Sequence, residues 1–309
     1  MTHPVSPDLS ARVGSLLLKN PVMSASGTFG YGLEFTPFYD ISRLGAVIVK
    51  GLSLLPTPGN APGRIVETPA GMLNAIGLQN IGVERFVHEV APRLDDAGAV
   101  YVANVYGRSI EEYEAMARRL SEVPALAAIE LNASCPNVKE GGIAFGSSPG
   151  GLSGLTRRVR AATGKPLWVK LSPNVSDIGE IARAAEEAGA DAVTLINTLV
   201  GMAVDPRTRR PILSNVTGGL SGPAVKPVAL RMVWEACKAV KIPVVGIGGI
   251  QSAGDALEFL LVGAAAVQVG TANFRNPNAC VEIVDGIRDF FVREKISRLD
   301  DYRGKLLLP

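Results

Sequence analysis

Eight short apolar runs recur along the chain, with segments of helical periodicity between them. The runs are rich in valine, isoleucine and alanine and nearly continuous rather than alternating, which is typical of parallel strands buried on both faces. They cover residues 21–26, 45–50, 99–107, 126–134, 166–173, 191–198, 243–249 and 265–271. Eight strand–helix repeats in 309 residues predict an α/β fold, a (β/α)₈ barrel that uses residues 1–309 as a single domain. A small N-terminal hairpin is expected to end at residues 16–20. A doubly wound sheet is the alternative, but the sequence marks no topological switch point.

Helix signals lie between these runs. Ser109 and Glu112 form a capping-box pattern before residues 111–120. Residues 177–189 carry an apolar face and end in glycine, and Ser252 precedes an apolar stripe within residues 255–264. Residues 82–94, which contain His88, also predict an amphipathic helix.

Three connections that follow strands are unusually long, namely residues 51–81, 135–151 and 197–223. Every segment that follows a barrel strand lies on the C-terminal face, where barrel enzymes carry their active sites. Long connections there are more often binding loops and lids than padding.

Composition narrows the classes of function. A net charge of +2 does not indicate the strongly basic surface that binds nucleic acid or an anionic membrane. Three cysteines without a CxxC pair indicate a reducing compartment and no cysteine-bound metal, and two histidines make a histidine triad or metal site improbable. The N-terminus lacks a secretion pattern and no apolar run reaches about 18 residues, so we expect a cytoplasmic protein that does not span a membrane.

Two glycine-containing loops predict a phosphate site. Gly248 and Gly249 end the seventh run, and Gly270 and Thr271 end the eighth. Glycine lets the backbone approach an anion closely, and this pair of loops is the usual phosphate site of barrels. Neither loop fits the dinucleotide fingerprint, so the pattern indicates a mononucleotide cofactor or a phosphorylated substrate. Glycines that only make tight turns are the alternative.

Lysines and amides dominate the remaining strand ends. Lys50 and Lys170 lie in or at the ends of apolar runs, where a cation is costly unless an anion balances it. Six amides occur at strand and loop ends: Asn74, Asn80, Asn104, Asn132, Asn137 and Asn197. Lysines and amides at the strand ends suit a planar, anionic ring system better than a metal or a sugar cation. Structural ion pairing of the lysines is the alternative.

Cys135 stands between Asn132 and Asn137 in the segment ELNASCPN, where an apolar run turns abruptly polar. This placement indicates chemistry delivered at the tip of a buried strand. A free cysteine that serves as a small buried hydrophobe is the alternative interpretation.

These motifs resemble the dihydroorotate dehydrogenases, the FMN-dependent barrel enzymes of pyrimidine synthesis. The resemblance runs essentially end to end and is carried by NPVMSASGTFGYG, GMLNAIGLQN, NASCPN, VKLSPN, GGLSGPA and GTANF. A cysteine in NASCPN marks the class 1 enzymes, and LNAIGLQN with NVKEGGIAFG is most similar to the 1B subclass. Residues 57–64 and Ser53 depart from the usual pattern of the family.

The resemblance implies roles for particular residues. Cys135 is the base that takes a proton from C5 of dihydroorotate while a hydride leaves C6 for the flavin. The substrate residues implied are Lys50, Asn74, Ala75, Ile76, Gly77, Leu78, Asn132, Asn137, Asn197 and Thr198. The FMN residues implied are Ser24, Lys50, Gly51, Asn104, Asn132, Lys170, Ile196, Gly222, Gly248, Gly249, Gly270 and Thr271.

The 1B resemblance also implies partners. It implies a homodimer joined to a subunit that carries FAD and a [2Fe–2S] cluster, a heterotetramer that passes electrons to NAD⁺. The alternative is a 1A-type enzyme in which fumarate is the electron acceptor. A phosphate-binding barrel lyase or isomerase with Lys170 as a Schiff-base lysine, or a barrel without catalytic activity, are the alternatives in function.

Overall fold

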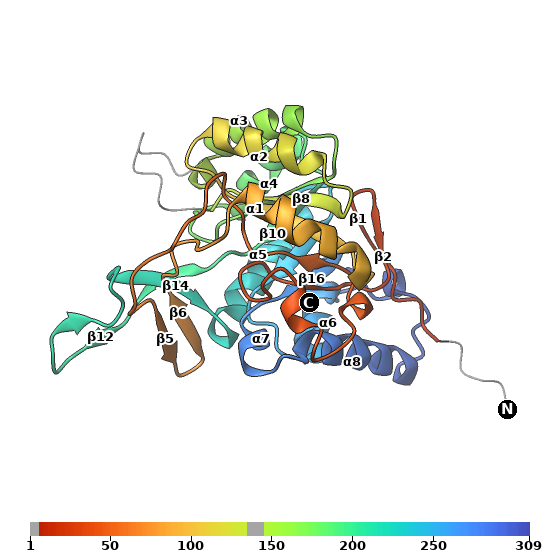
Figure 1. Cartoon of the computed structure of the whole chain (residues 1–309). Coiled ribbons are helices and arrows are strands. Elements are labelled where there is room, and N and C mark those ends of the chain that lie inside the picture. Colours follow the sequence, from red (N-terminus) through yellow and green to blue (C-terminus); the bar gives the residue numbers. More distant parts are fainter. Residues whose placement is uncertain (1–5, 135–144) are drawn as a thin grey trace.

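The computed structural model describes residues 6–134 and 145–309. Eight parallel strands form its central sheet, and helices lie around that sheet (Figure 1). The order of the strands in the sheet is β3-β16-β15-β10-β9-β8-β7-β4. A parallel bridge between Met23 and Ala46 joins the first strand of this order to the last, so the sheet curves round into a nearly closed barrel. The strands are β3 (Val22–Ser24), β4 (Val47–Ile48), β7 (Tyr101–Val105), β8 (Leu126–Asn132), β9 (Leu167–Lys170), β10 (Ala192–Leu195), β15 (Val244–Ile247) and β16 (Ala266–Val269). The predicted (β/α)₈ barrel is confirmed, and each strand lies within one of the eight apolar runs.

Helices surround the barrel and bury an apolar stripe against it. In α4 (Ile178–Glu187), for example, the predicted apolar face of Ile178, Ile181, Ala182 and Ala185 is buried. The helices are α1 (Val83–Arg85), α2 (Ile110–Ser121), α3 (Pro149–Ala162), α4 (Ile178–Glu187), α5 (Lys226–Ala239), α6 (Ala253–Leu261), α7 (Ala272–Arg275) and α8 (Ala279–Arg293). Shorter 3₁₀ turns cover Leu33–Phe35, Ile41–Arg43, Phe145–Ser147, Pro223–Val225 and Leu299–Asp301. None of the helices in the described part of the chain is long and apolar enough to cross a membrane.

The helix starts follow the sequence signals, with one difference. Ser252 and Asp255 form a complete capping box at α6. At α2 the Ser109 hydroxyl accepts from the Glu112 N–H, but the Glu112 carboxylate accepts from the Arg108 N–H instead of completing the box. The capping box predicted there is therefore only half formed, although the helix begins where expected.

Residues 82–94 do not form the regular amphipathic helix that their pattern predicts. The segment changes from α1 to a π-helical turn (Phe86–Val90) and then to 3₁₀ turns (Ala91–Arg93 and Asp95–Ala97). Pro92 has no N–H to donate to residue 88, so the regular hydrogen-bond ladder cannot continue past it. His88 is largely exposed and pairs with Glu84 at 3.5 Å, in agreement with a solvated surface histidine.

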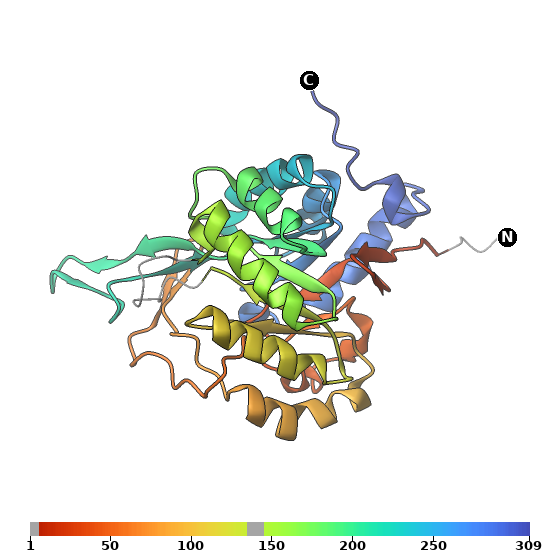
Figure 2. The same ribbon diagram turned by 90° about the horizontal axis from the view of Figure 1, so that it is seen from above.

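Antiparallel strands flank the barrel. The expected N-terminal hairpin consists of β1 (Ala11–Val13) and β2 (Leu16–Leu18). On the opposite side of the view in Figure 1 lies a four-stranded sheet of order β11-β14-β6-β5, built from β5 (Ile65–Thr68), β6 (Gly71–Asn74), β11 (Leu199–Met202) and β14 (Thr217–Ser221). The small hairpin of β12 (Val204–Asp205) and β13 (Arg210–Pro211) extends from it, and Figure 2 shows this arm projecting away from the barrel.

The sheet changes the interpretation of the long connections. Residues 51–81 and 197–223 were expected as loops, but each supplies two strands to this sheet. Its strands are short and none of them is buried along its whole length, so they need not be continuously apolar as the barrel strands are. The third connection, 135–151, ends earlier than predicted, because Ser148 caps α3 and Pro149 occupies its first turn.

Candidate functional site

The ends of β8, β9 and β10 bring three predicted site residues together. Asn132 and Lys170 are register partners in the parallel pair β8–β9, so their side chains point to the same side of the sheet. The Asn197 side-chain amide donates to Oδ1 of Asn132 at 3.3 Å, and the Lys170 ammonium donates to the Ser26 hydroxyl at 3.3 Å. Ser26 follows β3, which lies on another side of the barrel. These contacts therefore place the side chains over the barrel mouth.

Both predicted lysines lie in a low-dielectric environment that disfavours their charged form. Burial lowers the pKa of Lys170, and nearby Glu130 opposes that change. Burial also lowers the pKa of Lys50, and the positive charge of Arg64 lowers it further. Desolvation disfavours the charged form of an amine, so an anionic ligand between these side chains would stabilise both ammonium groups. The site therefore favours a ligand with delocalised negative charge.

A buried polar cluster lies inside the barrel below this mouth. The Asn104 amide donates to one oxygen of Glu130 at 2.7 Å, and the Gln268 amide donates to the other at 2.7 Å. All three side chains are almost completely inaccessible to solvent. Gly51 faces this cluster, because a Cβ atom there would lie 2.8 Å from Oδ1 of Asn104. The buried amides and Glu130 thus form a rigid polar floor.

Three loops form a cradle at the other edge of the mouth. The Thr271 hydroxyl donates to the Ser221 hydroxyl at 2.8 Å, which connects the loop after β16 to the end of β14. A Cβ atom on Gly249 would lie 3.0 Å from the Gly222 carbonyl and 2.7 Å from Cβ of Lys226. Gly249 also has a φ of +74°, a conformation that glycine adopts without strain. Only glycine lets these loops approach one another so closely.

The cradle fits a phosphate group. The backbone N–H groups of Gly248, Gly249, Gly270 and Thr271 donate no hydrogen bond to another described residue. Gly222 directly precedes the turn that leads into α5, so the positive end of this helix dipole also faces the cradle. Free N–H donors that converge on glycine loops are the usual means by which a protein backbone binds phosphate. The residues present thus suit the phosphate of a mononucleotide.

The predicted substrate segment 74–78 is held by Asn80, one of the predicted amides, and by Asn60, Arg64 and Tyr106, which the sequence did not indicate. Ala75 donates its N–H to the Arg64 carbonyl, and its own carbonyl accepts from the Asn60 amide. The Leu78 carbonyl accepts from the Asn80 amide and from the Tyr106 hydroxyl. The atypical loop 57–64 therefore packs directly against this segment and determines its position.

The other predicted residues have varied surroundings. Asn74 donates to the Gly219 carbonyl at 3.4 Å, and Thr198 packs against the α-carbon of Gly219. Ser24 is fully buried and its hydroxyl accepts from the Ile48 N–H, so that hydroxyl is already used to join β3 to β4. Ile196 is buried beside β15. Cys135 and Asn137 lie outside the described residues.

Three residues at or below the mouth were not predicted from the sequence: Ser26, Glu130 and Gln268. The signal for the last two was present, since each is a polar residue with apolar neighbours on both sides within a predicted buried strand. A polar residue at an inward position of a buried strand requires a partner. The sequence does not reveal that the two are partners, because 138 residues separate them.

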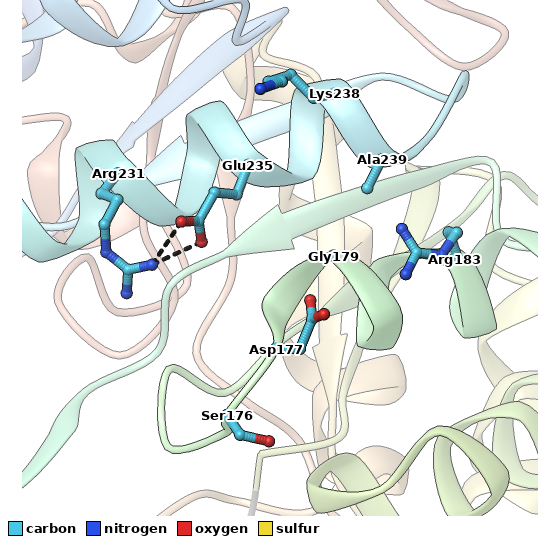
Figure 3. Close-up of a pocket in the computed structure, with 8 residues that line it drawn as sticks. All are labelled: Ser176, Asp177, Gly179, Arg183, Arg231, Glu235, Lys238 and Ala239. Atoms are coloured by element: carbon cyan, nitrogen blue, oxygen red, sulfur yellow. Dashed lines mark hydrogen bonds and ion pairs between the residues drawn. The ribbon is translucent and has the colours of Figure 1, made fainter.

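A surface groove of about 440 Å³ lies elsewhere, between α4 and α5 (Figure 3). Arg183 and Lys238 are among its lining residues, and Arg231 is paired with Glu235. The groove lies in the outer helical layer and contains none of the predicted site residues. We therefore assign the functional site to the barrel mouth and not to this groove.

Known proteins are similar to this chain along almost its whole length. The family model for dihydroorotate dehydrogenase matches residues 8–291. The chain is 56% identical over 302 residues to the dihydroorotate dehydrogenase B (NAD(+)) catalytic subunit of Trichlorobacter lovleyi, covering 98% of this chain and 99% of the relative. It is 56% identical over 299 residues to the protein of that name in Bacteroides thetaiotaomicron, covering 97% and 99% of the two chains. The corresponding protein of Geotalea daltonii is 55% identical over 300 residues, covering 97% and 98%.

Proposed function

Because this chain belongs to the dihydroorotate dehydrogenase family, we propose that it oxidises dihydroorotate to orotate in pyrimidine biosynthesis. The observation that carries the proposal is the barrel mouth itself. There, Lys170 and the amides of Asn132 and Asn197 lie at one edge and the glycine cradle at the other. An anionic, amide-containing ring and a mononucleotide phosphate both match these groups in charge and hydrogen bonding.

The substrate side of the proposal follows from hydrogen-bonding capacity. Orotate and dihydroorotate present a carboxylate together with ring carbonyl and N–H groups. Asn132, Asn197 and Asn74 each carry donors and an acceptor on one side chain, so they can pair with both kinds of ring group. Lys50 supplies a positive charge for the carboxylate. Residues 75–78, anchored by Asn60, Asn80 and Tyr106, would supply backbone groups.

Flavin mononucleotide, when bound, supplies the hydride acceptor of this reaction. The free N–H groups of Gly248, Gly249, Gly270 and Thr271 would hold its phosphate. Lys170 would lie beside the ring edge where negative charge develops on reduction, and its ammonium would stabilise that charge. Gly51 and Asn104 would support the ring from the barrel interior. The mononucleotide form is favoured because neither glycine loop fits a dinucleotide fingerprint.

We further propose that Cys135 is the general base. Oxidation at C5–C6 requires loss of a proton from C5 and of a hydride from C6, which bound flavin would accept. Cys135 follows β8 within NASCPN, and the described residues of the barrel mouth offer no histidine for the task. An ordinary thiol has a pKa near 8.5, so polar neighbours must favour the thiolate if Cys135 is to act near neutral pH.

The relatives are named as the catalytic subunit of dihydroorotate dehydrogenase B (NAD(+)), and this name supports a second subunit. We propose that two copies of this chain join two subunits that carry FAD and a [2Fe–2S] cluster, and that this heterotetramer passes electrons to NAD⁺. This chain has no dinucleotide fingerprint and no cysteine cluster of its own for that relay. The unpaired Cys237 and Cys280 support a reducing compartment such as the cytoplasm.

The test is spectroscopic. The purified chain is denatured, the released flavin is identified, and the native protein is titrated with dihydroorotate without oxygen. We expect one FMN per chain and loss of the flavin absorbance on addition of dihydroorotate. Orotate, which lacks the hydrogens to be transferred, is the matched control and leaves the flavin oxidised. Stoichiometric FAD, or an absorbance that dihydroorotate leaves unchanged, contradicts the proposal.

A further inference from the structure

Glu130 is a carboxylate enclosed within the barrel, and its hydrogen bonds show that its side chain points into the barrel interior. It is 0% exposed on β8, yet it accepts a hydrogen bond from Gln268 on β16. The two strands are not neighbours in the sheet, since β9, β10 and β15 separate them on one side. The contact therefore crosses the barrel interior, and the side chain of Glu130 points inward beneath the site.

Its hydrogen-bond partners leave its charge uncompensated. Asn104 and Gln268 are neutral amides, and among the described residues no cation forms an ion pair with Glu130 within 4.0 Å. Burying a carboxylate without a countercharge costs several kcal/mol even when it is hydrogen-bonded. A nearby cation inside the barrel would offset much of this cost.

Lys170 is placed to be that cation. Glu130 pairs in register with Trp168 on β9, and Lys170 lies two residues further along the same strand. Residues two apart on a strand project to the same face, so Lys170 and Glu130 are diagonal neighbours inside the barrel. Ser26 carries no charge, and Asn132 and Thr194, the register partners of Lys170, are also uncharged. Among the described residues, Glu130 is the charged group that acts on Lys170.

We propose that Glu130 is a positioning residue whose buried negative charge keeps Lys170 protonated beneath the cofactor and thereby sets the flavin reduction potential. The inference rests on the proposed function only for the location of the flavin. The charge pair itself belongs to this chain. Burial alone lowers the pKa of Lys170, and Glu130 counteracts that effect. Without Glu130 the ammonium would lose its proton at a lower pH.

Glu130→Gln isolates the charge because the hydrogen bonds can be kept. Oε1 of Gln268 is buried and has no partner in the described structure. If the Gln268 amide rotates by half a turn, this oxygen accepts from the introduced amide, which can still accept from Asn104. The matched control is Glu114→Gln on α2. Glu114 is also largely buried, but it pairs with Arg118 and Arg158 in the outer layer.

The primary experiment follows the Lys170 ammonium in the holoenzyme by NMR of ¹⁵Nζ-labelled lysine, with Lys170→Met to assign the signal. We expect its titration midpoint to fall by at least about one pH unit in Glu130→Gln, the scale of a lost neighbouring charge. Glu114→Gln should leave it unchanged. An unchanged midpoint in Glu130→Gln, or an equal shift in both variants, overturns the proposal.

A second measurement covers the case in which Glu130→Gln folds poorly. If the two charges compensate each other, adding Lys170→Met removes the isolated ammonium and the double variant unfolds at a higher urea concentration than Glu130→Gln alone. A double variant that is no more stable than Glu130→Gln overturns the charge pair.

Measuring the reduction potential of the bound flavin as a function of pH tests the inference and the proposed function separately. In Glu130→Gln the plot of potential against pH should bend downward above the lowered Lys170 midpoint, because a neutral amine no longer stabilises the reduced cofactor. The natural protein should show no bend at that pH. A shifted Lys170 midpoint with an unaltered potential plot would retain the charge pair and refute the location of the flavin beside Lys170.

Discussion

Replacing Gly248 by alanine tests the cradle directly. Gly248 has a φ of +131°, and a Cβ atom there would lie 2.7 Å from Cβ of Ala229. Ala229 is fully buried on α5, so it cannot rotate out of the way. Alanine at this position must therefore strain the backbone or displace the helix whose first turn follows Gly222.

The magnitude follows from two costs. A side chain in a sparsely populated backbone conformation costs about 1–3 kcal/mol. An extra methyl group in a packed core costs about 1–3 kcal/mol more. We therefore expect Gly248→Ala to lower the free energy of unfolding by about 2–6 kcal/mol. With about 2.1 cal/mol/K of unfolding entropy per residue, a chain of this length should melt roughly 3–9 °C lower.

The assay combines melting temperature with flavin content, measured with and without added FMN because a bound ligand raises the melting temperature. Gly154→Ala in α3 is the matched control, since a Cβ there meets nothing within 4 Å. This change should stabilise the helix by about 0.5–1 kcal/mol. The expected results thus have opposite signs for one chemical change. A Gly248→Ala protein that melts like the natural protein and retains all its flavin would refute the reasoning.

Three further predictions concern the cysteines and the electron acceptor. Cys135→Ala should retain its flavin but slow flavin reduction by dihydroorotate at least about a hundredfold in stopped-flow measurements, and a near-normal rate would remove Cys135 from the mechanism. Burial raises the pKa of Cys237 and of Cys280 to about 12, so neither carries much of the reactive thiolate at pH 8. Iodoacetamide at this pH should therefore label Cys135 first, and mass spectrometry detects which cysteine carries the label. Preferential labelling of Cys280 would contradict this. The isolated chain should reduce artificial dyes but not NAD⁺ until the electron-transfer subunit is added, whereas efficient turnover with fumarate would indicate the 1A-type alternative.

Much of the barrel was predictable because its determinants are local. Every strand buried on both faces must be apolar along its whole length, so all eight strands are visible as apolar runs in the sequence. Ser252 and Asp255 mark the start of α6 in the same way. The four-stranded sheet is not visible there, because β5 and β14 are half exposed and need neither apolar continuity nor regular alternation. Its strands are specified by pairing with partners far away in the chain.

The same distinction between local and long-range determinants applies to the functional site. The order of residues alone predicts several of the chemical groups near the barrel mouth: the glycines of the cradle, the two lysines and the amides. It does not specify which of them meet. The Glu130–Gln268 contact spans 138 residues, and the anchoring of Leu78 by Tyr106 spans 28. Only the closed barrel brings such residues within hydrogen-bond distance, because curvature and register depend on all eight strands together and on no single segment.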